Sequence, residues 1–111
     1  MKLNLNEYQL EAIKTYKYKS ENRIVYPALG LASEAGEVAG KVKKILRDCD
    51  GNFDSDGFKD DILSELGDVL WYVATMAYDM EITLDEVASH NIKKLMDREQ
   101  RGVISGSGDN R

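Results

Sequence analysis

The chain has 111 residues, a formal net charge of -5 and a single cysteine, Cys49. This length predicts one domain with a modest core, which oligomerisation would help to stabilise. The acidity argues against nucleic acid as the main partner, because a phosphate backbone needs a basic surface. No apolar run approaches the roughly 18 residues that span a membrane, and a lone cysteine cannot form an internal disulfide. We therefore expect a cytoplasmic protein with no membrane or nucleic-acid partner.

Helical periodicity predicts an all-α fold, and no segment alternates over enough residues to indicate a strand. Capping signals, with Asn6 as the first N-cap, define four helices. They are expected from about Asn6 to Lys19, Pro27 to Arg47, Phe58 to Met80 and Thr83 to Arg101. We expect residues 1–101 to form a single bundle-like domain and the glycine-rich tail, residues 102–111, to be irregular.

Two acidic motifs stand out: Glu34-Ala-Gly-Glu37 in the second helix and Glu65-Leu-Gly-Asp68 in the third. Carboxylates three residues apart share one side of a helix. At about 100° per residue, both pairs lie on the same edge of the apolar stripe of their helix. If the stripes pack together, four carboxylates converge, and each close pair repels by about 4 kcal/mol at roughly 4 Å and an effective dielectric near 20. A cation is needed to hold them together.

Magnesium is the cation that this pattern favours, because Mg²⁺ prefers hard carboxylate ligands and can offset the charge of phosphate oxygens. A single Glu-x-x-Glu is most often a solvated helix edge. Two matched pairs on equivalent edges favour a shared metal site instead.

The two motifs and the 27 residues between them resemble the signature of the MazG-like all-α nucleotide pyrophosphohydrolases. Leu29-Gly-Leu-Ala-Ser-Glu-Ala-Gly-Glu37 and Leu63-Ser-Glu-Leu-Gly-Asp-Val-Leu-Trp71 resemble that family in register. Tyr8-Gln9 and Asn91-x-x-Lys94-Leu with Arg98 do so more weakly. The resemblance covers roughly residues 5–101, and the tail is similar to the endings of small phage-type members.

The resemblance implies Mg²⁺-dependent hydrolysis of a ribo- or deoxyribonucleoside triphosphate to the monophosphate and pyrophosphate, with Mn²⁺ as an alternative metal. Glu34, Glu37, Glu65 and Asp68 would be the catalytic metal ligands, one of them orienting the attacking water. The family usually works as homodimers or dimer-based tetramers, and house-cleaning of the nucleotide pool is the expected role. The base, the sugar and the phosphorus that is attacked stay open.

Five further residues are candidates for substrate binding. Lys44 lies on the acidic side of its helix, where it could contact phosphate or pair with the carboxylates. Tyr72 shares the acid face and could stack on a base, although packing in the core or an interface is the more common role. Asn91, Lys94 and Arg98 lie along one edge of the last helix and could offset phosphate charge, or form a solvated basic edge.

The sequence admits three other interpretations. A di-iron carboxylate bundle needs Glu-x-x-His on two helices, and His90 is the only histidine. The acidic loop 48–57 resembles the start of a calcium-binding EF-hand but lacks the glutamate at its twelfth position, which favours a connector. A non-catalytic helical dimer that acts as an adaptor or regulator is the main alternative, and it should be indifferent to Mg²⁺.

Overall fold

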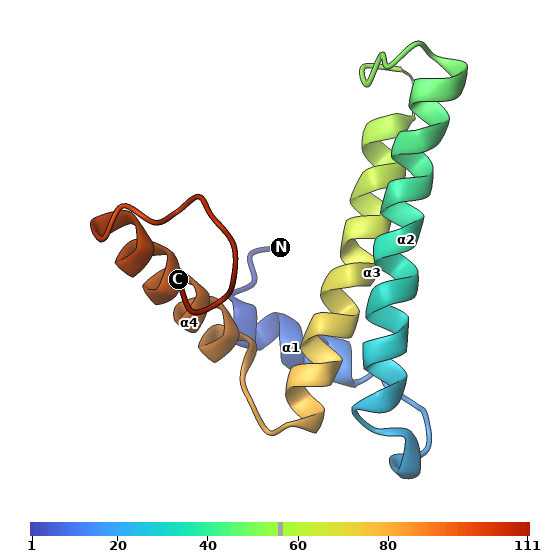
Figure 1. Cartoon of the computed structure of the whole chain (residues 1–111). Helices are drawn as coiled ribbons and strands as arrows, with labels where there is room; N and C mark the ends of the chain where they lie inside the picture. The colour runs from blue at the N-terminus through green and yellow to red at the C-terminus, as the bar shows by residue number, and fades with distance from the viewer. Residues whose placement is uncertain (56) are drawn as a thin grey trace.

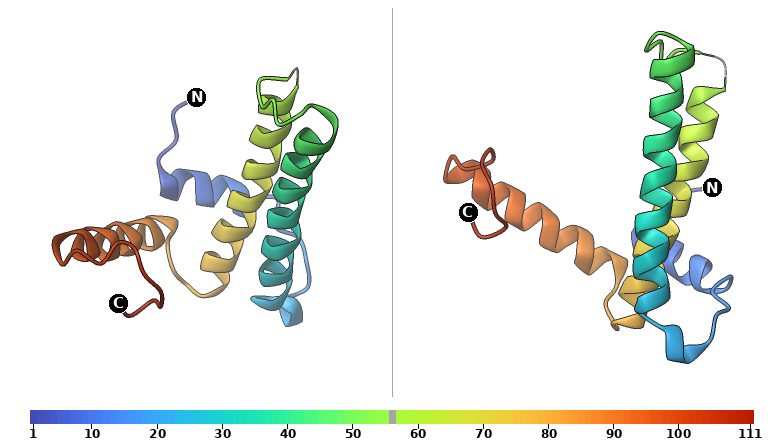
Figure 2. Two further views of the ribbon diagram at one scale, coloured as in Figure 1. Left: turned by 45° about the horizontal axis from the view of Figure 1, so that its top comes forward. Right: turned by 45° about the vertical axis from the view of Figure 1, so that its right-hand side comes forward.

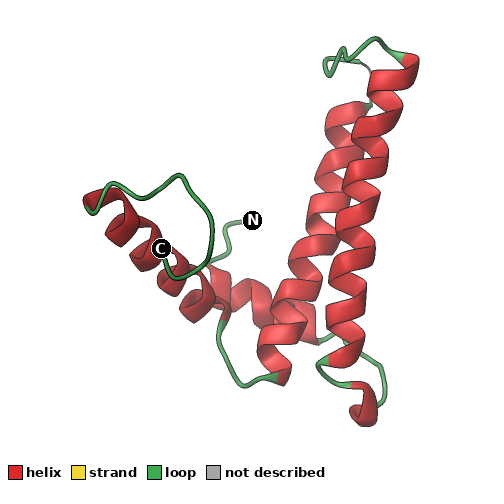
Figure 3. Ribbon diagram, viewed as in Figure 1, coloured by secondary structure: helices red, strands yellow, loops and turns green. Residues whose placement is uncertain are grey.

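The computed structural model describes residues 1–55 and 57–111. Its elements are α1 (Leu5–Ile13), the 3₁₀ turn η1 (Ser20–Asn22), α2 (Val25–Asp48), α3 (Phe58–Asp79) and α4 (Leu84–Gln100). The described residues contain no strand (Figure 3). The prediction of an all-α, four-helix fold is confirmed, and the last three helices begin and end within two residues of their expected bounds. Asp56, in the predicted connector, lies outside the described residues.

The first helix is shorter than predicted, since α1 ends at Ile13 and not near Lys19. The hydroxyls of Tyr16 and Tyr18 both donate hydrogen bonds to the buried carboxylate of Asp79, at the end of α3. Residues two apart point to different sides of an α-helix. The helix must therefore end before these two tyrosines for both to reach one acceptor.

The start of α1 also differs from the prediction. The side chain of Asn4, not Asn6, is the N-cap, and it accepts a hydrogen bond from the backbone amide of Glu7 at 2.8 Å. Asn6 instead accepts a hydrogen bond from the backbone amide of Asp85 at 3.0 Å. The predicted cap of the first helix thus accepts a hydrogen bond from one of the free amides at the start of α4.

Gln9 joins α1 to the turn between α3 and α4. Its buried side chain donates to the carbonyl oxygens of Ala74 and Ile82, both at 3.1 Å, and accepts from the amide of Leu84 at 3.0 Å. A buried amide whose donors and acceptor are all used fixes the angle between the elements that it connects. Gln9 therefore sets the direction in which α4 leaves α3.

The helices form an open arrangement within one chain (Figure 1). Helices α2 and α3 run antiparallel and side by side, α1 crosses beside the lower half of α3, and α4 points away from the α2–α3 pair (Figure 2). The small buried core lies where α1, α3 and α4 meet, and consists of Ala12, Ala74 and Leu84. None of the helices in the described part of the chain has the length and apolar composition of a membrane span.

Candidate metal centre

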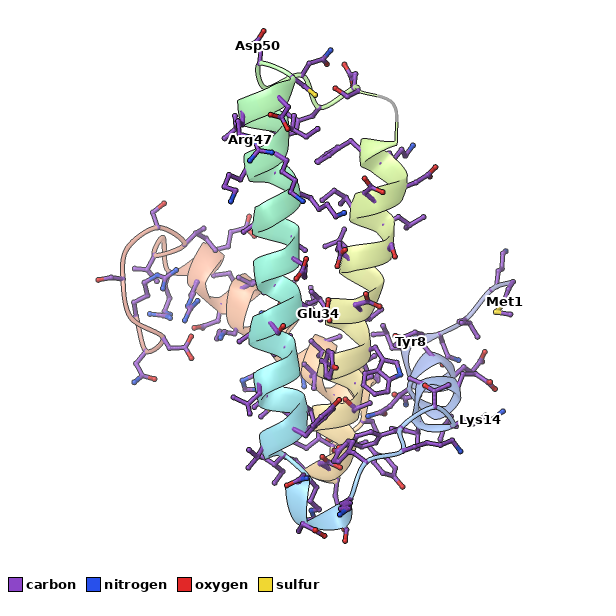
Figure 4. All side chains as sticks on the ribbon, turned by 90° about the vertical axis from the view of Figure 1, so that its right-hand side faces the viewer. Met1, Tyr8, Lys14, Glu34, Arg47 and Asp50 are labelled. Carbon is purple, nitrogen blue, oxygen red and sulfur yellow. The ribbon has the colours of Figure 1, made fainter. Side chains whose placement is uncertain are left out.

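Three carboxylates from two helices converge between α2 and α3. Glu34 of α2 and Glu65 and Asp68 of α3 each offer one oxygen, and these oxygens lie within 4.8 Å of one another. Glu34 and Glu65 are half-buried, whereas Asp68 is exposed. Figure 4 shows Glu34 projecting from α2 toward α3. The structure thus brings together three of the four acids that the two motifs contain.

Packing of the two apolar stripes positions these acids. The half-buried side chains repeat at the three- and four-residue intervals of a helix face. They are Leu31, Val38, Val42 and Ile45 on α2, and Ile62, Val69, Val73 and Met76 on α3. Because each acid pair borders its stripe, pressing the stripes together carries the carboxylates to a shared edge.

The electrostatics of the cluster are those of uncompensated negative charge. Desolvation raises the pKa of Glu34, and the charges of Asp68, Glu65 and Glu37 raise it further, as does a hydrogen bond with Glu65. Within residues 1–55 and 57–111, none of the three clustered acids forms an ion pair with a lysine or arginine. The fold therefore holds like charges together with no cation of its own beside them.

The donor set fits Mg²⁺. Octahedral Mg²⁺ takes oxygen ligands at about 2.0–2.1 Å, so two of its ligands lie roughly 3–4 Å apart. Oxygens already within 4.8 Å of one another reach this spacing through small side-chain rotations. Two half-buried carboxylates and one exposed carboxylate also leave part of the coordination sphere open to water or phosphate, which Mg²⁺ retains in most protein sites.

Glu37 stands apart from this cluster. It lies one turn beyond Glu34 on α2, it is exposed, and it does not belong to the three-carboxylate group. Its charge is still close enough to raise the pKa of Glu34. Its place as a metal ligand stays a prediction.

Tyr72 is the substrate-binding candidate that lies nearest to the acids. Burial raises the pKa of its hydroxyl, followed by a hydrogen bond with Tyr26 and the charges of Tyr26, Glu34 and Asp68. The ring packs against the backbone of Gly30, where an added Cβ would come within 2.2 Å of a ring carbon. Glycine at this position is what allows α2 to approach the tyrosine.

Two more tyrosines lie beside Tyr72 or the acids, and the site residues chosen from the sequence did not include them. Tyr26 has its ring 6.3 Å from that of Tyr72. Burial raises the pKa of Tyr8, and the charge of Asp68 raises it further, which places the α1 hydroxyl on the acidic side of α3 (Figure 4). The Tyr8-Gln9 resemblance was the available signal for Tyr8. Tyr26 offered only its position just before Pro27.

The remaining candidates lie outside the cluster. Lys44 is ten residues beyond Glu34, about 15 Å along the helix. The pKa of Asp48 is lowered first by its hydrogen bond from Arg47, and the charge of Lys44 lowers it further. Asn91, Lys94 and Arg98 belong to α4, which diverges from the α2–α3 pair (Figure 1). Within one chain, the acids and the basic edge of α4 therefore occupy separate regions. Substrate contacts by these four residues stay predictions.

The fold and the cluster are those of an all-α protein built around a carboxylate site shared by two helices. Residues 27–103 match the family model of the MazG nucleotide pyrophosphohydrolase domain. The chain is also 45% identical over 115 residues to the Gene 37 protein of Mycobacterium phage L5. That alignment covers 98% of this chain and 100% of the phage protein. No solved structure matches the chain. The chain therefore belongs to the MazG nucleotide pyrophosphohydrolase domain family, and the resemblance seen in the acidic motifs is confirmed.

Proposed function

We propose that the protein is a Mg²⁺-dependent hydrolase that converts a nucleoside triphosphate to the monophosphate and pyrophosphate. The observation that carries this proposal is the convergence of three carboxylates, none of them paired with a lysine or arginine among the described residues, in a chain of the MazG family. Like charges this close repel one another, and a bound cation would relieve that repulsion. House-cleaning of the nucleotide pool is the role that we propose for the reaction.

Glu34, Glu65 and Asp68 are the residues that would hold Mg²⁺ or Mn²⁺. The ion, when bound, would offset phosphate charge and lower the pKa of a coordinated water. Glu37 lies one turn beyond Glu34, outside the three-carboxylate group, and is solvent-exposed, so we assign it to orienting the attacking water and accepting its proton. The water oxygen forms a new bond to the α- or β-phosphorus, and the bond from that phosphorus to the oxygen bridging the two breaks, with its electron pair staying on the bridging oxygen of the other product.

The tyrosines beside the acids would contact the nucleoside. The ring of Tyr72 is near enough to Glu34 to feel its charge, and the ring of Tyr26 lies 6.3 Å from that of Tyr72. Nucleobases stack on aromatic side chains with an energy of about 1–3 kcal/mol per base. A base held there leaves the phosphates to extend along α2 and α3 toward the carboxylates. This assignment fits any base, because every base has a π-face.

We further propose that two copies of the chain assemble. A compact monomer of 12.5 kDa exposes about 6,200 Å², whereas this chain exposes 8276 Å². The excess of roughly 2,000 Å² is within the range that one subunit buries in an obligate dimer. The radius of gyration of 16.8 Å likewise exceeds the roughly 13 Å expected for a compact domain of this length.

The apolar surface that a second copy would cover lies on α3 and α4. Leu63 and Leu66 of α3 are 69% and 52% exposed, and Ile92 and Met96 of α4 are 54% and 55% exposed. An apolar hollow of about 200 Å³ lies where α3 meets α4, and it is lined by residues of α2, α3, the following turn and α4. Sedimentation velocity at micromolar concentration should show a dimer or a tetramer, and a monomer would contradict this assembly.

A product assay tests the proposed activity. The protein is incubated with Mg²⁺ and each of the common ribo- and deoxyribonucleoside triphosphates, and the products are separated by anion exchange. We expect a monophosphate and pyrophosphate in equal amounts from at least one nucleotide, and no turnover in EDTA. Release of orthophosphate without pyrophosphate, or no turnover on any nucleotide by a folded protein, would overturn the proposal and favour the adaptor.

A further inference from the structure

The glycine-rich tail folds back onto α4 and binds its basic residues (Figure 1). The carboxylate of Asp109 accepts hydrogen bonds from Lys94 Nζ at 2.9 Å and from Arg98 Nη2 at 3.0 Å. The backbone carbonyl of Asp109 accepts a further hydrogen bond from Arg98 Nη2 at 2.5 Å. One tail residue thus engages both cations that the sequence had marked for phosphate binding.

The exposed fractions of the two side chains show that Asp109 covers Arg98. The side chain of Arg98 is 7% exposed, whereas that of Asp109 is 81% exposed. Both hydrogen-bond acceptors of the Arg98 guanidinium in residues 1–55 and 57–111 belong to Asp109. Asp109 therefore sits over the guanidinium from the solvent side. If the tail left, the arginine would need another anion, because a nearly buried and unpaired charge is strongly unfavourable.

The tail closes into a loop through its own last residue. The Arg111 guanidinium donates to the carbonyl oxygens of Val103, Ile104 and Gly108, and Arg101 donates to the carbonyl of Arg111. Of residues 102–111, only Val103 and Arg111 are half-buried, and the others are exposed. Polar contacts and little apolar burial therefore hold the tail on α4. A competing anion can release it without opening a hydrophobic core.

We infer that Lys94 and Arg98 form an anion site that Asp109 occupies, and that the polyphosphate group of a nucleotide or of pyrophosphate displaces Asp109 and releases the tail. The reason is chemical likeness. A carboxylate offers one negative charge to the two cations, whereas pyrophosphate offers several charges and the same oxygen geometry for the guanidinium. The lowered pKa of Asp109, caused first by its hydrogen bonds to Lys94 and Arg98, is consistent with this strong anion site.

The choice of polyphosphate as the ligand rests on the proposed function, but the site itself can be tested without turnover. Inorganic pyrophosphate is titrated into the full chain in EDTA by calorimetry, so that the acid cluster cannot bind it through a metal. If the tail is closed about 90% of the time, only about a tenth of the molecules can bind pyrophosphate. Asp109→Asn should then tighten pyrophosphate binding by about tenfold, because the tail no longer occupies the site.

Glu99→Gln is the matched control. Glu99 is exposed on α4 and forms no ion pair among the described residues, so the substitution removes one negative charge without touching a contact of the tail. We expect this variant to bind pyrophosphate within about twofold of the unsubstituted chain, since an isolated exposed charge contributes little. If both substitutions tightened pyrophosphate binding equally, the effect would come from the change in net charge alone, and the inference would be overturned.

Hydrogen exchange gives an independent measure of the tail. Pyrophosphate should speed exchange of the amides in residues 103–111 and slow it around Lys94 and Arg98. The same measurement with a nucleoside triphosphate in EDTA shows which polyphosphate the site binds. Release of the tail by the nucleotide but not by pyrophosphate would identify the substrate as the ligand. Protection of the tail by both ligands would overturn the inference. Tail release by a protein with no turnover would instead keep the anion site and refute only the proposed function.

Discussion

The two charged regions of the molecule have opposite electrostatics. Between α2 and α3, three carboxylates lie within 4.8 Å of one another with no ion pair among the described residues, and the pKa of Glu34 is raised. On α4, Lys94 and Arg98 are bound to Asp109, whose pKa is lowered. Among the described residues, no lysine or arginine pairs with the acids of the first region, whereas the cations of the second pair with a carboxylate of their own chain. A ligand should therefore stabilise the acid cluster directly but must compete for the basic site.

Removing one clustered carboxylate should have the largest effect. Asp68→Asn should lower Mg²⁺-dependent turnover by at least about 100-fold, which corresponds to roughly 2.7 kcal/mol of transition-state stabilisation. The reason is that the variant loses a charged ligand while keeping its shape. Turnover is measured beside far-ultraviolet circular dichroism. Asp60→Asn is the control, since Asp60 is an exposed acid on the same helix outside the cluster. Turnover of the Asp68 variant within about twofold of the original would contradict the site.

Weakening the contacts that fix the angle between α3 and α4 should have the next largest effect. Gln9→Ala removes three hydrogen bonds that connect α1 to α3 and to the start of α4, and leaves buried backbone groups unpaired. We expect the free energy of unfolding to fall by about 2–4 kcal/mol, measured by urea denaturation. Gln100→Ala, at the exposed end of α4, should change it by less than about 0.5 kcal/mol. A similarly small change in the free energy of unfolding in both variants would show that Gln9 does not fix the angle between α3 and α4.

Two glycines of α2 should respond in opposite directions. In Gly30→Ala the new Cβ would meet the Tyr72 ring at 2.2 Å, so the ring must move or the helices must separate. We expect a loss of about 1–3 kcal/mol in stability. Gly36→Ala, between the two acids of the first motif, has no atom within 4 Å of its Cβ and gains up to about 1 kcal/mol of helix propensity. Thermal unfolding of both variants checks the order, and the reverse order would contradict the packing of α2 on α3.

The raised pKa of Glu34 predicts a smaller effect that depends on pH. Since the folded chain binds this proton more tightly than the unfolded chain, its contribution to stability is present below the ordinary pKa of 4.5 and is lost as pH rises through the folded value. In EDTA, Glu34→Gln should therefore melt at a higher temperature than the original chain, by a margin that grows as pH rises above 4.5. Glu99→Gln, on exposed α4 surface, is the control. A difference in melting temperature that shrinks with rising pH would contradict a raised pKa of Glu34.

Much of the fold followed from local signals in the sequence. Helical periodicity, Pro27 and the cap at Thr83 predicted α2, α3 and α4 to within two residues, because each signal acts within one or two turns. The end of α1 did not follow. It depends on hydrogen bonds from Tyr16 and Tyr18 to Asp79, more than sixty residues away in sequence, and no local pattern encodes that contact.

The candidate site was predictable in part for the same reason. The position of each acid pair on the edge of its stripe predicted that carboxylates of α2 and α3 would meet, and three of them do. The separation of Glu37 was not predictable, since a helical wheel does not give the rotation of one helix against the other. Nor was the place of Arg98, because the direction of α4 depends on Gln9 and the cover over Arg98 depends on the tail.

Calorimetric titration with Mg²⁺ tests the central contrast most directly. We predict saturable binding to the original chain, retained in Asp60→Asn and lost in both Glu34→Gln and Asp68→Asn, at a pH where all carboxylates are ionised. The same titration in Asp109→Asn should be unchanged, because the tail lies on α4 and not on the acid cluster. Absence of Mg²⁺ binding to the original chain, or binding of equal strength to the Asp68 variant, would contradict the account.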